Sequence, residues 1–239
     1  MLVSTAQRAR SSPLPLNEVN IAGCTVPLSD GIKILGVTID RHLTYNTRVQ
    51  NISKSVNYHI RALKHIRSSL TTDIAKTVVC ALVNSLLNCA NSVLYGTSEI
   101  GLNIAKLQRL QNALARVVTY TKRIERIHPV LETLHWLPIN YRIDYKVATL
   151  AYKIRSSGSP VYLLPAVSDY TNAIQLRSST RLLLSKPPVK TETARRAFSQ
   201  DAPSVWNTLP NSTTTADTFA RFRTSIHIHT QHYWLIFEL

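Results

Sequence analysis

Basic side chains recur at helical spacing and are the residues with the clearest potential for chemistry. One such row has spacings of four, three and four residues: Lys54, Tyr58, Arg61 and His65. Residues at these spacings stack on one side of an α-helix. From Arg41 to Thr72 there are six Lys and Arg and no Asp or Glu. A solvated helix face usually mixes both signs, so this composition favours contact with phosphates.

Two further basic rows follow along the chain. They contribute Lys106, Arg109 and Arg116, with Lys122, Arg123 and Arg126 close behind, and then Arg142, Lys146 and Lys153. Tyr141, Tyr145 and Tyr152 flank the last row; such rings can stack on bases, although tyrosines at helical spacing are more often packing residues. The predicted nucleic-acid-binding residues are Lys54, Arg61, Lys64, Lys106, Arg109, Arg116, Arg142, Lys146 and Lys153.

The sequence lacks the common catalytic and metal-binding patterns. The 13 carboxylates are scattered singly, without a D-x-D pair, whereas two-metal chemistry needs converging carboxylates. His227, His229 and His232 have metal-like spacing but no nearby second shell, and His135 is interpreted as a packed histidine. We therefore expect no catalytic residue, metal site, cofactor or small-molecule substrate in this chain.

The overall charge is the outlier in the composition. The sequence has 28 Lys and Arg, a net charge of +15 and a pI near 10.1. So basic a chain usually has a polyanionic partner, nucleic acid first, with an anionic membrane surface or a misread gene fragment as weaker interpretations. The most apolar run, residues 74–95, contains Lys76 and three asparagines, which argues against a membrane span.

The cysteines are few and widely separated. Cys24, Cys80 and Cys89 form no C-x-x-C pair, so no zinc site is expected. With no signal peptide, they indicate an intracellular location, in the nucleus or the cytoplasm, and we expect them to be small buried apolar side chains.

The predicted class is α+β and mostly α: a helical bundle preceded by short antiparallel strands and followed by a mixed, less regular region. Strands are expected at residues 1–4, 19–22, 25–28 and 32–39, because β-rich segments alternate with turn formers. Apolar periodicity predicts helices at 45–69, 74–95 and 102–119, and a fourth long helix from Pro138 to Ser156. Beyond residue 160 we expect a strand at 181–189 and helices at 194–206, interrupted by Pro203, and at 217–227.

The chain turns at residues 128–139. Pro129 and Pro138 are each expected to start a helix, because proline fits the first helical turn, and a short helix carrying Trp136 is expected between them. The expected regions are 1–43, 44–157 and 158–239.

Several blocks occur in an order typical of one family. They are residues 32–40, 94–96, 106–108 with 111–113, 128–139 with Arg142-Ile143 and Tyr145-Lys146, then Pro160 with Tyr162-Leu163, 176–178, Ala197-Phe198, and Ala202-Pro203 with Trp206-Asn207 and Leu209-Pro210. Across almost its whole length the chain resembles the C-terminal part of the reverse transcriptases of non-LTR, LINE-type retrotransposons, the jockey-like branch in particular. It departs from the family at 88–92, where an acid and an aromatic are replaced, and after Ile226.

The resemblance implies the end of a palm at 1–43, a helical thumb at 44–157 and a C-terminal extension at 158–239. Residues 35–37 would then lie near the primer-grip turn. The Y-x-D-D aspartates of the palm would precede Met1, as would an endonuclease domain, and Mg²⁺ would belong to that missing palm. The resemblance thus implies a catalytically incomplete fragment of an RNA-directed DNA polymerase that holds RNA or an RNA–DNA duplex.

Two alternatives stay open. The basic rows could bind an acidic protein surface, which would make the chain a helical protein-interaction or structural module. The chain could also be a translated relic without a function. The sequence predicts no membrane partner and leaves the oligomeric state open.

Overall fold

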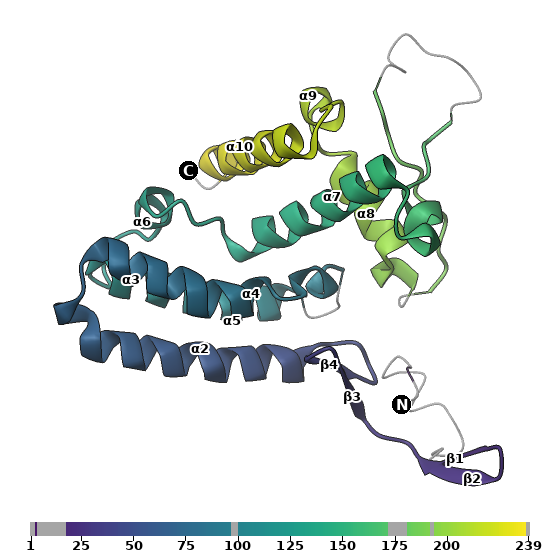
Figure 1. Ribbon diagram of the computed structural model, residues 1–239, viewed down its shortest axis with the longest axis horizontal. Coiled ribbons are helices and arrows are strands. Elements are labelled where there is room, and N and C mark those ends of the chain that lie inside the picture. The colour runs from purple at the N-terminus through teal and green to yellow at the C-terminus, as the bar shows by residue number, and fades with distance from the viewer. Residues whose placement is uncertain (1–2, 4–17, 97–99, 172–180, 192–193, 238–239) are drawn as a thin grey trace. The chain divides into compact units, whose positions relative to one another are not determined.

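The computed structural model describes residues 3, 18–96, 100–171, 181–191 and 194–237, with side chains up to His229 except that of Ile100. Two short β-hairpins precede a predominantly helical chain (Figure 1), which confirms the α+β, mostly α class. The chain divides into two compact units: residues 1–90 with 97–125, and residues 91–96 with 126–239. The expected regions 1–43, 44–157 and 158–239 stay a prediction.

The strands form two separate antiparallel hairpins. β1 (Glu18–Ile21) pairs with β2 (Cys24–Pro27), as predicted. The single strand predicted at 32–39 is wrong: β3 (Gly31–Ile34) pairs with β4 (Val37–Asp40) across a two-residue turn. Both turn residues have positive φ, 48° at Leu35 and 81° at Gly36, which suits the twist of a tight hairpin. Of the strand predicted at residues 1–4, all but Val3 lies outside the described residues.

A carboxylate joins β4 to the first long helix. Asp40 accepts hydrogen bonds from the Thr44 N–H and hydroxyl, each at 2.9 Å, and from the Tyr45 N–H at 2.7 Å. Burial alone would raise the pKa of Asp40, but these hydrogen bonds outweigh it, so the pKa lies below its usual value. Asp40 therefore fixes the turn from which α2 (Asn46–Ile66) starts.

The segment after α2 is more broken than its apolar pattern predicts. A 3₁₀ turn η1 (Arg67–Ser69) leads to α3 (Thr72–Val79), which the Thr71 side chain caps by accepting from the Ile74 N–H. A π-helical turn η2 (Cys80–Asn84) and α4 (Ser85–Asn88) follow. The single helix predicted at 74–95 is wrong beyond Asn88, because Cys89 is extended and Ala90 has φ 44°. The 3₁₀ turn η3 (Asn91–Leu94) follows this break.

The expectation that the cysteines are buried is also wrong. Cys24, Cys80 and Cys89 are all exposed rather than buried. The buried Arg48 guanidinium donates to the Cys89 carbonyl, which satisfies a backbone oxygen where the helix ends. Arg48 therefore stabilises the chain at the unpredicted break.

The core of the first unit lies between α2, α3 and α5 (Ile100–Thr119). Val56 of α2 and Leu107, Leu114 and Val118 of α5 are fully or almost fully buried. These are positions that the three- and four-residue apolar spacing predicts. Figure 1 shows α2 lying alongside α5 in this unit.

In the second unit, both prolines lie at helix starts, as predicted. Pro129 is in the first turn of α6 (His128–Thr133), and Pro138 is the N-cap of α7 (Ile139–Ser157). Trp136 lies in the connection after α6 rather than within that helix, and is buried at 4% exposure. Gly158 ends α7 in the left-handed conformation.

The elements after α7 are η4 (Val161–Val167), η5 (Ala194–Arg196), α8 (Phe198–Trp206), α9 (Asn211–Thr214) and α10 (Phe219–Phe237). Of these, η4, α8 and α10 pack on α7, while η5 contacts α8 and α9 contacts α10. Phe222 stacks between Tyr152 and Trp206, with ring centroids 4.3 and 5.9 Å away. The strand predicted at 181–189 is reduced to one bridge, between Asp169 and Leu184. The helix predicted at 194–206 is broken by extended Ala197, not by Pro203, which lies inside α8.

Candidate nucleic-acid interface

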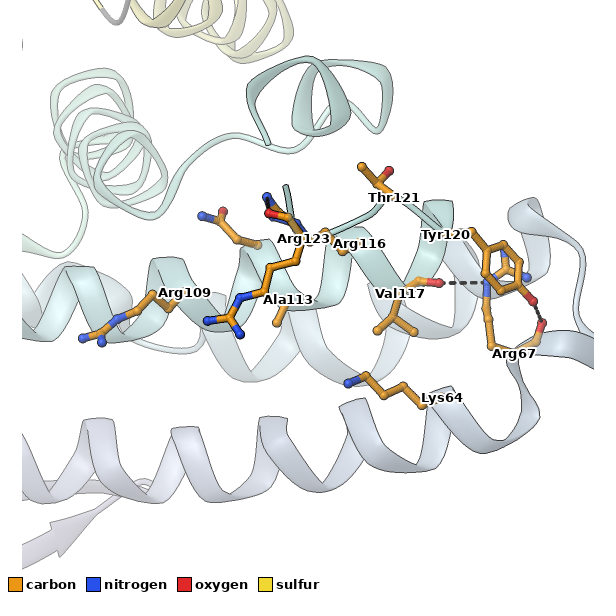
Figure 2. Close-up of a pocket in the computed structure, with 10 residues that line it drawn as sticks. Lys64, Arg67, Arg109, Ala113, Arg116, Val117, Tyr120, Thr121 and Arg123 are labelled. Atoms are coloured by element: carbon orange, nitrogen blue, oxygen red, sulfur yellow. Dashed lines mark hydrogen bonds between the residues drawn. The ribbon is translucent and has the colours of Figure 1, made fainter. Parts of the chain in front are cut away.

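An open pocket of about 800 Å³ lies in the first unit, beside the C-terminal halves of α2 and α5 (Figure 2). Five of its lining residues are cationic and none is acidic. The lining residues are Lys64, Arg67, Arg109, Asn112, Ala113, Arg116, Val117, Tyr120, Thr121 and Arg123. The pocket is therefore a concentrated positive surface in a chain that is already basic.

Helix periodicity places these side chains together. On α5, Asn112 and Ala113 follow Arg109 by three and four residues, and Arg116 follows them by four and three, so the four residues share one face. On the helical wheel that face lies opposite the buried positions Leu107 and Leu114. Lys64 belongs to the last turn of α2, which packs along α5 and so forms the opposite wall.

Arg67 is a cation of the pocket with a structural role. It is 3% exposed, and its guanidinium donates to the Val117, Val118 and Leu70 carbonyls and to the Thr72 hydroxyl at 2.5–3.2 Å. Within the described part of the chain, no carboxylate pairs with it. The Val117 and Val118 carbonyls lie at the C-terminal end of α5, where the helix dipole favours a cation.

Tyr120 is fixed directly against Arg67. Its hydroxyl donates to the Arg67 backbone oxygen at 2.9 Å, and the guanidinium carbon of Arg67 lies 4.2 Å from the ring centroid. Tyr120 follows the last residue of α5 with φ 59°, a conformation that is strained for a non-glycine residue. The two contacts with Arg67 oppose this strain, and 62% of Tyr120 stays exposed.

The Arg116 guanidinium also donates its hydrogen bonds to backbone carbonyls. It donates to the Lys122, Arg123 and Glu125 carbonyls at 3.3, 3.4 and 2.8 Å. The Glu125 carboxylate in turn accepts from the Lys122 N–H at 3.0 Å. Arg116 therefore stabilises the loop that carries Arg123.

Three cations of the pocket have donors left for a ligand. Arg109 uses Nε on the Ala105 carbonyl at 3.1 Å, which leaves its two terminal nitrogens. In the described ranges, the side chains of Lys64 and Arg123 have no hydrogen-bond partner. All three are exposed. Lys64, Arg109 and Arg123 are therefore the side chains best suited to bind an anion here.

The predicted binding residues divide between the two units. Lys64, Arg109 and Arg116 line the pocket together. Lys54, Arg61 and Lys106 are exposed in the same unit but do not line it. Arg142, Lys146 and Lys153 belong to the second unit. The pocket residues Arg67, Tyr120 and Arg123 were not among the predicted binding residues.

Two of the three predicted residues on α7, Arg142 and Lys153, make contacts within the protein. Arg142 Nε donates to the Leu137 carbonyl at 2.7 Å, and Lys153 Nζ lies 4.7 Å from the Phe219 ring centroid. Lys146 is exposed. Of the flanking tyrosines, Tyr152 is buried and donates to the Ala216 carbonyl, so the packing interpretation holds for it. Contact of any of these residues with nucleic acid stays a prediction.

Three acidic groups of the second unit have shifted pKa values. Burial raises the pKa of Asp144 to about 6 and that of Asp201 to about 7, the latter against the opposing effect of Lys186. Burial, together with these two carboxylates, raises the pKa of Tyr95 to about 12. Across the described residues, no group of three His, Cys, Asp or Glu is arranged to hold a metal ion. The side chain of His232 lies outside that description.

No helix in the described ranges is both long enough and apolar enough to cross a membrane. No protein-family model, curated protein or solved structure matches the chain. The function of the cationic pocket therefore has to be inferred from its geometry and charge, together with the sequence.

Proposed function

We propose that this chain binds RNA or an RNA–DNA duplex through phosphate contacts, and that the pocket between α2 and α5 is the centre of the interface. The observation that carries this proposal is the pocket lining of five cations without an acid. Nucleic-acid affinity depends largely on Lys and Arg that neutralise phosphates. Lys64, Arg109 and Arg123 have the free donors for this role, while Arg67 and Arg116 hold the walls and add charge.

The resemblance to LINE-type reverse transcriptases supports the same function. In such an enzyme this region would be a thumb that follows template and primer. The 239 residues contain no Y-x-D-D. We propose that the chain supplies binding and no catalytic group for polymerisation, and that Mg²⁺ would act at a palm outside this sequence. Lys54, Arg61 and Lys106 would extend the interface along the first unit.

The exposed arginines favour a nucleic-acid backbone over one acidic side chain as the ligand. Arg109 and Arg123 can bind phosphate oxygens with two nitrogens each, a geometry that guanidinium groups favour. The pocket is open to solvent, which suits a strand that continues beyond it on both sides.

The test is binding of RNA–DNA duplexes of increasing length at several salt concentrations. We expect the logarithm of the affinity to fall linearly with the logarithm of salt concentration, with a slope of about −0.7 to −0.9 for each phosphate contacted. We also expect affinity to rise with duplex length until the interface is filled. Binding that is absent or independent of salt would contradict the proposal. If the true partner were an acidic protein, the affinity of the chain for duplexes would not depend on duplex length.

A further inference from the structure

Tyr120 presents an exposed aromatic ring inside the cationic pocket. It is 62% exposed and lines the pocket together with Lys64 and Arg123. Figure 2 shows Tyr120 beside Arg67 at one end of the group of basic side chains. An exposed ring that is fixed in place loses little freedom when another ring stacks on it.

The contacts with Arg67 determine which side of the ring is available. The guanidinium covers one face at 4.2 Å, and the hydroxyl bond to the Arg67 backbone oxygen fixes the ring orientation. The exposure of Tyr120 therefore belongs mainly to the other face. A ring of this kind, with a cation behind it and cations beside it, suits a flat group attached to phosphates.

Nucleic-acid bases are such groups. Stacking on aromatic side chains is a general way to bind single-stranded nucleic acid, combined with a basic surface for the backbone. The pocket, at about 800 Å³, is within the ~300–1,000 Å³ range of small-molecule sites. A base inside a duplex is already stacked on both faces, so an interior base has to be unpaired before it can stack on Tyr120.

We propose that the pocket takes an unpaired nucleotide of a single-stranded segment, with its base stacked on the free face of Tyr120 and its flanking phosphates on Lys64 and Arg123. This inference rests on the proposed function and specifies which form of nucleic acid enters the pocket. Arg67 is a positioning residue in it, since it orients Tyr120 without touching the base.

The alternative is that Tyr120 has only a structural role and makes no contact with nucleic acid. The ring could serve only to cover the Arg67 guanidinium and to hold the end of α5. In that case nucleic acid would bind by phosphates alone, and the bases would add nothing. The two roles differ in one measurable quantity, the gain in affinity that bases provide at a constant number of phosphates.

The experiment compares a thymidine oligonucleotide of about 12 nucleotides with an oligonucleotide of the same length in which every residue is abasic. Both carry the same phosphates. For the full chain we expect the base-bearing strand to bind about 10-fold more tightly. Equal affinities would overturn the inference, yet salt-dependent binding of both strands would leave the proposed function standing. Binding of neither strand would overturn the inference alone, because the proposed function is tested separately by the binding of RNA–DNA duplexes.

Two variants assign the effect to Tyr120. Tyr120→Leu should make the base-bearing and abasic strands bind with equal affinity, and Tyr120→Phe should keep the preference for the base-bearing strand because it keeps the ring. An unchanged preference in Tyr120→Leu would contradict the inference. If Tyr120→Leu does not fold, photocrosslinking of a 5-iodouridine strand to the unmodified chain decides: crosslinks should map to Tyr120, and crosslinks confined to other residues would overturn it.

Discussion

The Tyr120 hydroxyl donates to the Arg67 backbone oxygen at 2.9 Å, while the Arg67 guanidinium lies 4.2 Å from the centre of the Tyr120 ring. These reciprocal contacts join the end of α5 to the turn after α2. They also place a buried cation behind an exposed aromatic ring. The same pair thus stabilises the first unit and shapes the pocket.

Arg67 should be essential for stability. Arg67→Met would leave the Val117, Val118 and Leu70 carbonyls without their donor, and unsatisfied buried acceptors cost about 1–3 kcal/mol each. We expect the free energy of unfolding, measured in urea, to fall by about 3 kcal/mol. The matched control is Arg61→Met on the exposed face of α2, which should change it by less than about 0.5 kcal/mol. Similar losses in both variants would contradict the assigned role of Arg67.

Trp136 should behave as a core residue. Because it is only 4% exposed, Trp136→Ala should lower the free energy of unfolding by about 3–5 kcal/mol. Tyr162→Ala, at a position that is 79% exposed, should have little effect. Denaturation followed by circular dichroism measures both. A small loss for Trp136→Ala would mean that the ring is open to solvent.

The carboxyls of Asp144 and Asp201 should make stability depend on pH. Their pKa values in the folded chain, about 6 and about 7, lie above the reference value of 3.8, so the folded chain binds these protons more tightly than the unfolded chain. Their contribution is therefore most favourable at low pH and is lost as the pH rises from about 4 to about 7.

Asp201→Asn isolates this effect, because the amide cannot ionise. We expect it to raise the free energy of unfolding at about pH 8 more than at about pH 5, with a difference on the order of 2 kcal/mol. Glu132→Gln, at an exposed carboxylate of the same unit, serves as the control for the loss of a surface charge. An Asp201→Asn effect that is equal at both pH values would contradict the raised pKa.

Two glycines test the backbone of the first unit. Gly36 has φ 81° in the β3–β4 turn with open space around its Cβ position, so Gly36→Ala should cost about 1 kcal/mol through backbone strain alone. Gly101 is helical and also has open space, so Gly101→Ala should stabilise the chain by up to about 1 kcal/mol. Thermal melts of both variants should therefore shift in opposite directions. An unchanged or higher melting temperature for Gly36→Ala would argue against the β3–β4 turn.

The long helices could be predicted because their apolar spacing matches their burial, as at Leu107 and Leu114. The turn at Leu35-Gly36 and the break at Ala90 could not, because leucine and alanine give no local signal for positive φ. The fold class followed from the helices and was unaffected by these errors.

The positive charge of the candidate site could be predicted from the sequence. Which of its arginines bind the backbone and which keep free donors could not. In the sequence, Arg67 and Arg116 are indistinguishable from Arg109, because all are arginines among apolar helical positions. Only tertiary structure shows that Arg67 and Arg116 bind backbone carbonyls at helix ends and loops. Arg123 lies in a loop without periodicity, and Tyr120 depends on a contact with a residue 53 positions away.

The proposed function assigns nucleic-acid binding to the cationic pocket rather than to net charge alone. A pocket variant with Lys64→Glu, Arg109→Glu and Arg123→Glu can be compared with a surface variant with Lys33→Glu, Lys190→Glu and Arg195→Glu, in which the three positions are also exposed. Both variants change the net charge equally. The decisive measurement is the affinity for an RNA–DNA duplex as a function of salt concentration.

We expect the pocket variant to lose at least about 10-fold in affinity and the slope of its salt dependence to become shallower by about two units. The surface variant should stay close to the original chain. Equal losses of affinity in the two variants would contradict the claim, because binding would then depend on total charge and not on the pocket.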